Sequence, residues 1–230
     1  METKNNVVPP DYNDYIYRFM YFVLSPIAPL IPKSITPNQI TVLGFFSAMT
    51  GTVLLYFIQT PIAYIYWIIF NFIWFVLDAL DGMHARLTQQ SSEFGAFLDH
   101  SLDNIYFIFM LTVFAAKFDL FHLLYIYIII LRVTAALMVF AVQAHTRRFY
   151  LSRFSGGLEF LLLSTVMILS YCYPNINPAL LTTNLFLLHC INILNLQQGM
   201  FMKCALFFYF IGVPVNMILQ FQFAKKVLTQ

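Results

Sequence analysis

Charged residues are scarce in this chain. Only 10% of its 230 residues are Asp, Glu, Lys or Arg, whereas soluble domains average about 25%. Hydrophobic residues make up 60% of the sequence, and the mean hydropathy is +0.76. Apolar runs close to the length of a membrane-spanning helix recur along the chain. These proportions exclude a soluble globular domain and predict an all-α, polytopic membrane protein.

The low net charge and the small number of cysteines exclude further classes of function. The formal net charge is only +2, and no basic cluster alternates with aromatic residues, so a nucleic-acid partner is not expected. The three cysteines, Cys172, Cys190 and Cys204, are too far apart for a CxxC motif, which argues against a disulfide framework or a thiolate metal site. The N-terminal residues also lack the basic region and apolar core of a signal peptide.

A long polar linker is absent as well, so a single transmembrane domain is expected over residues 39–224. Residues 1–38 are assigned to an N-terminal tail and an interfacial helix, because residues 11–30 form an amphipathic, aromatic-rich segment. Six transmembrane helices are expected, with seven as the alternative count. The expected spans are residues 40–59, 62–80, 97–116, 120–142, 156–172 and 204–223. Residues 178–197 are rich in Asn and Thr and are predicted to be re-entrant or interfacial.

The basic residues suggest an orientation, because Lys and Arg favour the cytoplasmic side of a membrane. The positions expected to share that side are Arg86, Arg147, Arg148, Arg153, Lys225 and Lys226. An even number of spans satisfies this arrangement, which favours six. Arg132 lies within a predicted span, so it is expected to face the site or a neighbouring helix rather than lipid.

Four carboxylates interrupt the apolar pattern. Asp78 and Asp81 are three residues apart near the end of the second predicted span, and Asp99 and Asp103 are four apart at the start of the third. Either spacing puts both acids of a pair on one helix face. A short connection makes the two spans antiparallel neighbours. The sequence therefore predicts that all four carboxylates converge at one membrane depth, on the cytoplasmic side.

Such a cluster needs a cation. Four carboxylates cannot all stay ionised in a partly dry site without compensation, and oxygen ligands favour hard ions such as Mg²⁺, Mn²⁺ or Ca²⁺. Two ions bridged by carboxylates form the clamp used for displacement at phosphorus. Gly82, Ala85 and Gly95 leave room for a substrate or a facing helix, and Arg86 offers a planar fork for a phosphate oxygen. The pattern suggests phosphoryl-type transfer.

Two other interpretations of the acids remain open. Acids at membrane helix ends are often only hydrated interface residues, although that role requires no fixed spacing among eight residues. A membrane cation carrier also accounts for the carboxylates, but it leaves Arg86 without a role. A carrier would place comparable acids in other spans, whereas residues 39–77 and 155–215 contain just one, Glu159.

The spacing of these residues resembles the signature of the CDP-alcohol phosphotransferase (CDP-alcohol phosphatidyltransferase) family. The eight matching positions are Asp78-x2-Asp81-Gly82-x2-Ala85-Arg86-x8-Gly95-x3-Asp99-x3-Asp103. The segment Pro37-Asn38-x2-Thr41-x2-Gly44 is also similar to the stretch that leads into the family's first span. The resemblance covers residues 10–172 and implies a six-helix core preceded by a surface helix.

The resemblance implies transfer of a substituted phosphate from a CDP-alcohol donor to the hydroxyl of a lipid or polar-alcohol acceptor, with release of CMP. Asp78, Asp81 and Asp99 would hold two divalent cations, Mg²⁺ or Mn²⁺, on the diphosphate. Asp103 would touch the second ion and act as general base. The residues assigned to the cytidine nucleotide are Asn38, Thr41, Gly82, Ala85, Arg86, Ser92 and Gly95. An active site on the cytoplasmic face, contacts with membrane lipids and a homodimer are also implied.

The nature of the transferred alcohol is predicted from two further likenesses. A histidine directly after the third acid, as at His100, is typical of the choline/ethanolamine phosphotransferases. The stretch from Phe149 to Glu159 is similar to a segment of the same subgroup. His100 and Glu159 are therefore predicted to act near the acceptor hydroxyl, although Glu159 also suits the N-terminus of a helix.

The favoured reaction is transfer from CDP-choline or CDP-ethanolamine to diacylglycerol, in phospholipid biosynthesis. The alternative is a CDP-diacylglycerol-dependent phosphatidyltransferase acting on glycerol phosphate, inositol or serine. Length favours this alternative, because the compact chain resembles the small microbial members, many of which use CDP-diacylglycerol.

Overall fold

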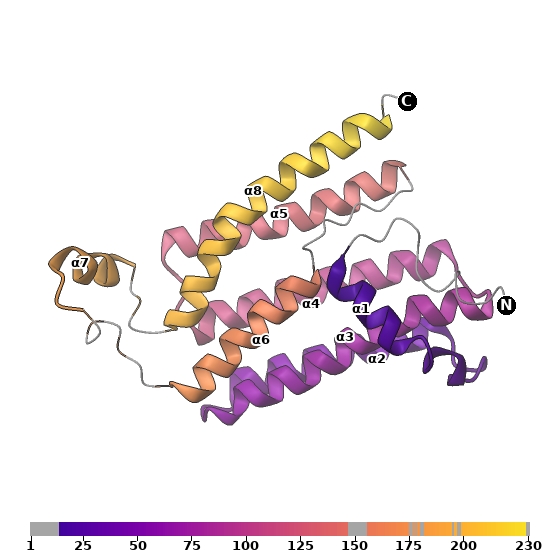
Figure 1. The fold of residues 1–230 in the computed structure, drawn as a ribbon, viewed down its shortest axis with the longest axis horizontal. Helices are drawn as coiled ribbons and strands as arrows, with labels where there is room; N and C mark the ends of the chain where they lie inside the picture. Colours follow the sequence, from indigo (N-terminus) through magenta and orange to yellow (C-terminus); the bar gives the residue numbers. More distant parts are fainter. Residues whose placement is uncertain are drawn as a thin grey trace. The chain divides into compact units, whose positions relative to one another are not determined.

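The computed structural model describes residues 14–146, 156–174, 177, 179, 182–194, 196 and 199–228. These residues form helices and connections with no strand among them (Figure 1), which confirms the all-α class. The elements in chain order are α1 (Tyr15–Leu24), the 3₁₀ helix η1 (Ala28–Leu30), α2 (Pro37–Phe57), α3 (Ile62–Thr88), α4 (Glu93–Lys117), α5 (Leu123–Thr146), α6 (Gly156–Cys172), α7 (Leu185–Ile193) and α8 (Met200–Leu228).

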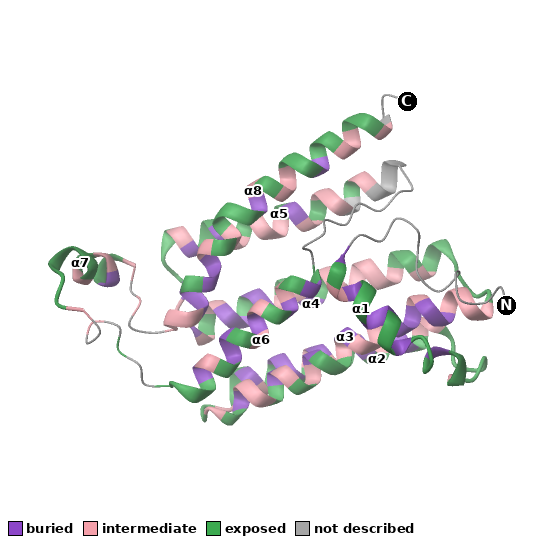
Figure 2. Cartoon of the chain, viewed as in Figure 1, coloured by how far each residue is buried: buried purple, intermediate pink, exposed green. Residues whose placement is uncertain are grey.

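Three helices of the described chain are long and apolar enough to cross a membrane. They are α2, α3 and, within α8, residues Met200–Val227. Shorter apolar stretches lie in α5, at Leu123–Val139, and in α6. Many large apolar side chains on these helices are exposed, in the segments coloured green in Figure 2, and a bilayer accommodates such surfaces better than water does. This pattern is typical of an integral membrane protein, and the count of six spans stays a prediction.

Helix α3 is longer than predicted. The sequence predicts a loop over residues 81–95, yet α3 continues well into that range. Gly82 alone does not end the helix, because most residues around it are good helix formers and none is Pro. The helix ends where Gln89 adopts a left-handed backbone with φ 60° and the N–H of Gln90 donates to the carbonyl of Ala85 at 2.9 Å. This is the Schellman arrangement without the glycine that normally signals it.

The C-terminal region contains one short and one long helix. Within residues 178–197, α7 is capped by Asn184, whose side chain accepts hydrogen bonds from the N–H groups of Phe186 and Leu187. This helix has 9 residues, too few to cross a bilayer. Helix α8 contains the whole predicted span 204–223 and extends it at both ends, with Pro214 inside.

The residues form two compact units. Unit 1 comprises Met1–Leu54, Tyr66–Phe107 and Leu151–Leu161, and unit 2 comprises Leu55–Ile65, Ile108–Tyr150 and Leu162–Gln230. The boundaries among the described residues cut through α2, α3, α4 and α6 rather than through a polar linker. The predicted division of the chain into residues 1–38 and 39–224 stays a prediction.

Helix α1 buries one of its faces in unit 1. The buried residues of α1 recur at helical spacing, and they are Tyr17, Met20, Tyr21 and Leu24. They join one cluster with residues of α3 and α6, among them Phe75 and Phe160. The Phe75 ring stacks on the Phe160 ring at 4.8 Å and meets the Tyr17 ring edge-on at 4.9 Å. This aromatic cluster fixes α1 beside α3.

The start of α1 also lies against the start of α6. Asp14 caps α1 by accepting hydrogen bonds from the N–H groups of Ile16 and Tyr17. A Cβ atom on Gly157 would lie 2.6 Å from Ile16 Cβ and 3.0 Å from Asp14 Oδ1, so the approach requires glycine. The predicted position of α1 on the membrane surface is compatible with its exposed outer residues and stays a prediction.

Unit 2 contains a fully buried lysine. The Nζ of Lys203 in α8 lies 4.0 Å from Asp119 Oδ2 and 5.6 Å from the centre of the Tyr125 ring. The Tyr125 hydroxyl donates to the carbonyl of Leu194 at 2.6 Å. A carboxylate and an aromatic face therefore compensate this buried charge within the protein.

Candidate active site

Helix α3 presents the first half of the signature on one face. Asp78, Asp81, Gly82, Ala85 and Arg86 follow the spacing i, i+3, i+4, i+7 and i+8, which lines up side chains along a helix. A Cβ atom on Gly82 would lie 3.2 Å from Arg86 Nη1. The absence of a side chain at position 82 thus leaves the guanidinium room to lie back along the helix, toward Asp81.

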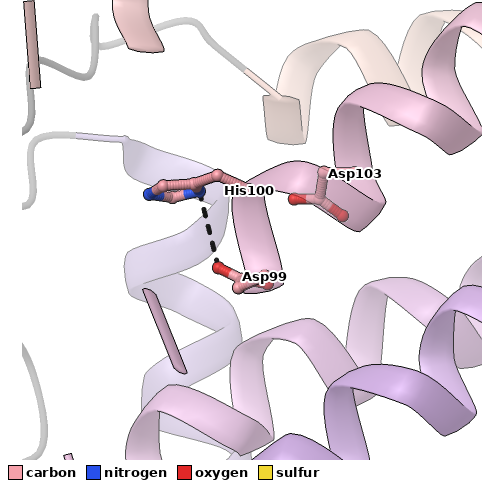
Figure 3. Close-up of side chains that lie close together, drawn as sticks. All are labelled: Asp99, His100 and Asp103. Atoms are coloured by element: carbon pink, nitrogen blue, oxygen red, sulfur yellow. Dashed lines mark ion pairs between the residues drawn. The ribbon is translucent and has the colours of Figure 1, made fainter. Parts of the chain in front are cut away.

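Helix α4 supplies the second half. Asp99 and Asp103 are one turn apart near its N-terminus, and His100 Nδ1 lies 3.6 Å from Asp99 Oδ2 (Figure 3). Each of these three residues offers one ligand atom, and the three atoms lie within 4.8 Å of one another. The group has a geometry suited to a metal ion, and it includes His100, which the sequence analysis did not assign as a ligand.

The structure brings the acids of both helices into one site. Asp99 interacts electrostatically with Asp103, Asp78 and Asp81. Asp103 interacts with Asp78 and Asp81 in the same way. The arginine that interacts with this group is Arg86, through Asp81. Four like charges with so little compensation from the protein form a site that favours a cation.

Each acid except Asp99 is held by a hydrogen bond from another side chain. The Tyr17 hydroxyl donates to Asp78 Oδ2 at 2.7 Å. The Thr41 hydroxyl donates to Asp81, and the indole N–H of Trp74 donates to Asp103. These bonds come from α1, α2 and α3, so three helices orient the carboxylates.

One carboxylate oxygen is left over. Asp99 Oδ1 is buried, and no hydrogen bond from the described residues reaches it. A buried acceptor without a donor is costly, and a divalent cation would satisfy it. The carboxylate oxygens suit Mg²⁺ or Mn²⁺, whereas the His100 imidazole is a ligand type more usual for transition metals. The carboxylates therefore fit the hard divalent ion that the sequence predicts.

The residues predicted to contact the nucleotide lie in the same unit. A Cβ atom on Gly95 would be 3.1 Å from Asn38 Oδ1 and equally far from Ser92 Oγ. Ser92 Oγ also accepts a hydrogen bond from the Gly95 N–H at 2.9 Å. The start of α2 thus approaches the start of α4, and Thr41 one turn later reaches Asp81.

The remaining predicted residues fall in different places. Glu159, in the first turn of α6, belongs to unit 1 and interacts electrostatically with Tyr106, as Asp103 does. Arg132 belongs to unit 2, where it lines a small cavity with residues of α4, α5, α6 and α8, so it faces neighbouring helices as expected. The predicted cluster of Arg147, Arg148 and Arg153 lies outside the described residues.

Three aromatic residues of the site were missed by the sequence analysis. Tyr17 and Trp74 donate to Asp78 and Asp103, and the Tyr21 ring lies 5.6 Å from Arg86 Cζ. The sequence contains 14 Tyr and 26 Phe, so single aromatics are not distinctive. A usable signal was the i, i+4 spacing of Tyr17 and Tyr21 on the buried face of α1.

Residues 34–211 match the CDP-alcohol phosphatidyltransferase family. The chain belongs to this family. Its members are metal-dependent, in agreement with the carboxylate cluster on α3 and α4. The match covers every residue of the signature and extends through α6 and α7 into α8.

Curated relatives within the CDP-alcohol phosphatidyltransferase family differ in their substrates. An uncharacterized class-I family protein of Schizosaccharomyces pombe is 35% identical over 144 residues, covering 56% of this chain and 36% of that protein. Choline/ethanolaminephosphotransferase 1 of Saccharomyces cerevisiae is 27% identical over 151 residues, covering 61% and 38%. Archaetidylinositol phosphate synthase of Pyrococcus horikoshii is 39% identical over 76 residues, covering 33% and 38%. The chain thus matches less than two-fifths of the length of each relative.

Proposed function

We propose that this protein is an integral-membrane CDP-alcohol phosphotransferase of phospholipid biosynthesis. It transfers a substituted phosphate from a CDP-alcohol to an acceptor hydroxyl and releases CMP. The observation that supports this proposal most strongly is the convergence of Asp78, Asp81, Asp99 and Asp103 beside Arg86. An arginine beside a cation-binding acid cluster suits a diphosphate.

Two divalent cations, Mg²⁺ or Mn²⁺, would be held by Asp78, Asp81, Asp99 and Asp103. When bound, such ions neutralise the diphosphate and stabilise the charge that develops during displacement at phosphorus. The protein's own contribution is positioning: Tyr17, Thr41 and Trp74 hold three of the carboxylates in fixed orientations. Pre-oriented ligands pay less of the entropic cost of reaching the reactive geometry.

The donor nucleotide would lie along the small residues of the signature. Gly82, Ala85 and Gly95 leave space between α3 and α4, and Arg86 would hold a phosphate oxygen. Asn38, Thr41 and Ser92 would contact the cytidine from the starts of α2 and α4. In the reaction, the acceptor oxygen bonds to the phosphorus that carries the alcohol, and the bridging P–O bond breaks so that CMP leaves.

Asp103 is proposed to accept the proton of the attacking hydroxyl. A hydroxyl is a poor nucleophile at neutral pH, and a neighbouring carboxylate accelerates its attack by about 10²–10⁴-fold. Asp103→Asn is therefore expected to keep CDP binding while CMP release falls by about that factor, measured by calorimetry and by a nucleotide assay. Normal turnover in Asp103→Asn would show that Asp103 is not the general base. His100 and Glu159 are proposed to position the acceptor.

The substrate pair proposed first is CDP-choline or CDP-ethanolamine with diacylglycerol. Support comes from His100 after the third acid and from the similarity to Choline/ethanolaminephosphotransferase 1. The alternative is CDP-diacylglycerol with a small polar alcohol, and the similarity to Archaetidylinositol phosphate synthase favours an inositol phosphate as that alcohol. Both pairs use the same carboxylate site.

A CMP-release assay with purified protein tests the function and the substrate pair together. The assay contains CDP-choline, CDP-ethanolamine or CDP-diacylglycerol as the donor, Mg²⁺ or Mn²⁺, and a panel of acceptors. The expected result is CMP release that requires one donor, one acceptor class and the divalent ion. Ion flux in proteoliposomes without CMP release from any donor would instead favour a cation carrier. An Asp99→Asn variant, prepared in parallel, is the control for contaminating activity.

The proposal also includes six transmembrane helices, an active site on the cytoplasmic face and a homodimer. Accessibility labelling of cysteines introduced at exposed Ser91 and at the α4–α5 connection in intact cells would test the two faces. Opposite labelling is expected, because α4 separates the two positions. Equal labelling of both positions would contradict this topology.

A further inference from the structure

A buried histidine lies on α3 between the signature residues. His84 is only 1% exposed, and it occupies a position that the signature leaves unspecified. Its Nε2 lies 2.8 Å from the carbonyl of Ile35, so Nε2 carries the proton and donates. Its Nδ1 is buried, and no partner among the described residues reaches it. The ring therefore makes its side-chain hydrogen bond to the backbone that precedes α2.

The same backbone segment is held at a second point. Gln90, just beyond the end of α3, donates from Nε2 to the carbonyl of Lys33 at 3.1 Å. Two carbonyls that lie two residues apart, at Lys33 and Ile35, are thus bound by side chains from the C-terminal part of α3 and the turn that follows it. Segment 31–36 has no helix or strand of its own. One turn bond, from the Ile35 N–H to the Pro32 carbonyl at 3.0 Å, lies within it, and the two side-chain bonds hold it to α3.

Segment 31–36 leads directly into the nucleotide-side residues. At its end, the Thr36 N–H donates to Gln39 Oε1 at 2.8 Å and the Gln39 N–H donates to Thr36 Oγ1 at 3.3 Å. This reciprocal capping box joins the segment rigidly to the first turn of α2. Asn38 and Thr41 lie in the next positions, against Gly95 and Asp81 respectively.

We propose that His84 is a positioning residue for the donor nucleotide. By holding segment 31–36 to α3, it sets where the first turns of α2 stand relative to the carboxylates, and so where Asn38 and Thr41 meet the cytidine. This inference rests on the proposed function. It predicts that His84 acts on donor affinity, and that the chemical step is affected little as long as Thr41 keeps its hydrogen bond to Asp81.

Two substitutions of different length test the hydrogen bond. A Gln side chain places its amide N–H near the position of His Nε2, whereas an Asn side chain reaches only as far as Nδ1. His84→Gln is therefore expected to bind CDP with Mg²⁺ as the wild type does, and His84→Asn to bind it about fivefold to tenfold more weakly. The measurements are calorimetry with CDP and steady-state CMP release, in which KM for the donor rises in His84→Asn while kcat stays within about twofold.

A second measurement separates positioning from loss of fold. Hydrogen–deuterium exchange is expected to rise in the peptide that covers residues 31–41 of His84→Asn and to stay unchanged in α6. Exposed His189 on α7 provides the matched control, His189→Asn, which should match the wild type in every assay. Equal CDP affinity in His84→Asn and His84→Gln, or a loss of kcat without a change in KM, would overturn the inference. Failure of the wild-type protein to bind any cytidine nucleotide would instead overturn the proposed function.

Discussion

The two units of the molecule treat buried charge in opposite ways. In unit 2, the buried Lys203 has a carboxylate and an aromatic ring beside it, so its charge is compensated inside the protein. In unit 1, four carboxylates repel one another, and Arg86 interacts with Asp81 among them. A compensated charge supports the fold, whereas an uncompensated cluster of like charges reduces stability unless it binds a counter-ion.

Because its carboxylates repel one another, unit 1 needs hydrogen bonds from neighbouring side chains to hold them in place. The carboxylates are held by hydroxyl and indole donors from several helices, and a buried network lies behind them. In that network, the Tyr106 hydroxyl donates to Asn71 and lies 3.5 Å from the Thr52 hydroxyl. These neutral donors orient the acids without cancelling their charge. The site therefore stays available to an external cation.

The largest effect is expected from removing a carboxylate of unit 1. Asp78→Asn, Asp81→Asn or Asp99→Asn should each reduce CMP release by about 10³-fold, because the metal-bound diphosphate is no longer held and neutralised. Without divalent ions, the unfolding temperature should stay equal or rise, because the repulsion among the acids is smaller. Glu93→Gln, an exposed acid on α4, is the control. A strong loss of stability in the Asn variants would show that the acids are structural.

In unit 2, the expected result is the reverse. Lys203→Met should lower the free energy of unfolding by about 2 kcal/mol, because Asp119 loses its cationic partner and the Tyr125 ring loses the ammonium beside it. CDP affinity of the folded fraction should not change. Thermal unfolding in detergent with and without CDP measures both quantities, and Lys226→Met at the exposed end of α8 is the matched control. Weaker CDP binding in Lys203→Met would contradict the prediction that this lysine of unit 2 contributes to stability and not to nucleotide binding.

Two adjacent glycines test how closely α1 approaches α6. Gly157→Ala should destabilise the protein by about 1–3 kcal/mol, because its Cβ would lie 2.6 Å from Ile16 Cβ. Gly156→Ala places its Cβ at an ordinary 3.6 Å from the Tyr17 ring and should be nearly neutral. Thermal unfolding of the pair measures the difference. Equal stabilities would show that α1 shifts freely on α6.

The smallest effect concerns a single hydroxyl. Tyr17→Phe keeps the ring against Phe75 but removes the hydrogen bond to Asp78, so CMP release should fall by about threefold to tenfold. The unfolding temperature should change little. Tyr15→Phe, on the exposed face of the same helix, is the control. An unchanged rate in Tyr17→Phe would mean that Asp78 needs no orientation from α1.

The periodicity of apolar residues in the sequence was sufficient to predict the positions of several helices. Helix α6 begins and ends at the predicted residues, because Gly156 and the polar stretch after Cys172 mark its limits. The end of α3 was placed too early, because the polar stretch over residues 81–95 was interpreted as a loop, whereas the helix stops at a left-handed Gln89. A non-glycine residue in that conformation leaves no reliable sign in the sequence.

The acid pairs could be identified from the sequence, because short-range spacing determines which helix face they share. Their hydrogen-bond partners could not be identified in this way. Tyr17, Thr41 and Trp74 reach the acids through tertiary contacts, which the sequence does not reveal. His84 could not be predicted either, since its partner is a backbone carbonyl, and every residue has one.

The packing of α1 against the start of α6 has a consequence for biosynthesis. A ribosome completes α1 long before it reaches Gly157 and Phe160, against which α1 is seated. All four acids are also made before these residues, so a nascent chain carries the whole signature while Tyr17 still lacks its final support. The contacts that hold Tyr17, and through it Asp78, are therefore complete only after the start of α6 has been made.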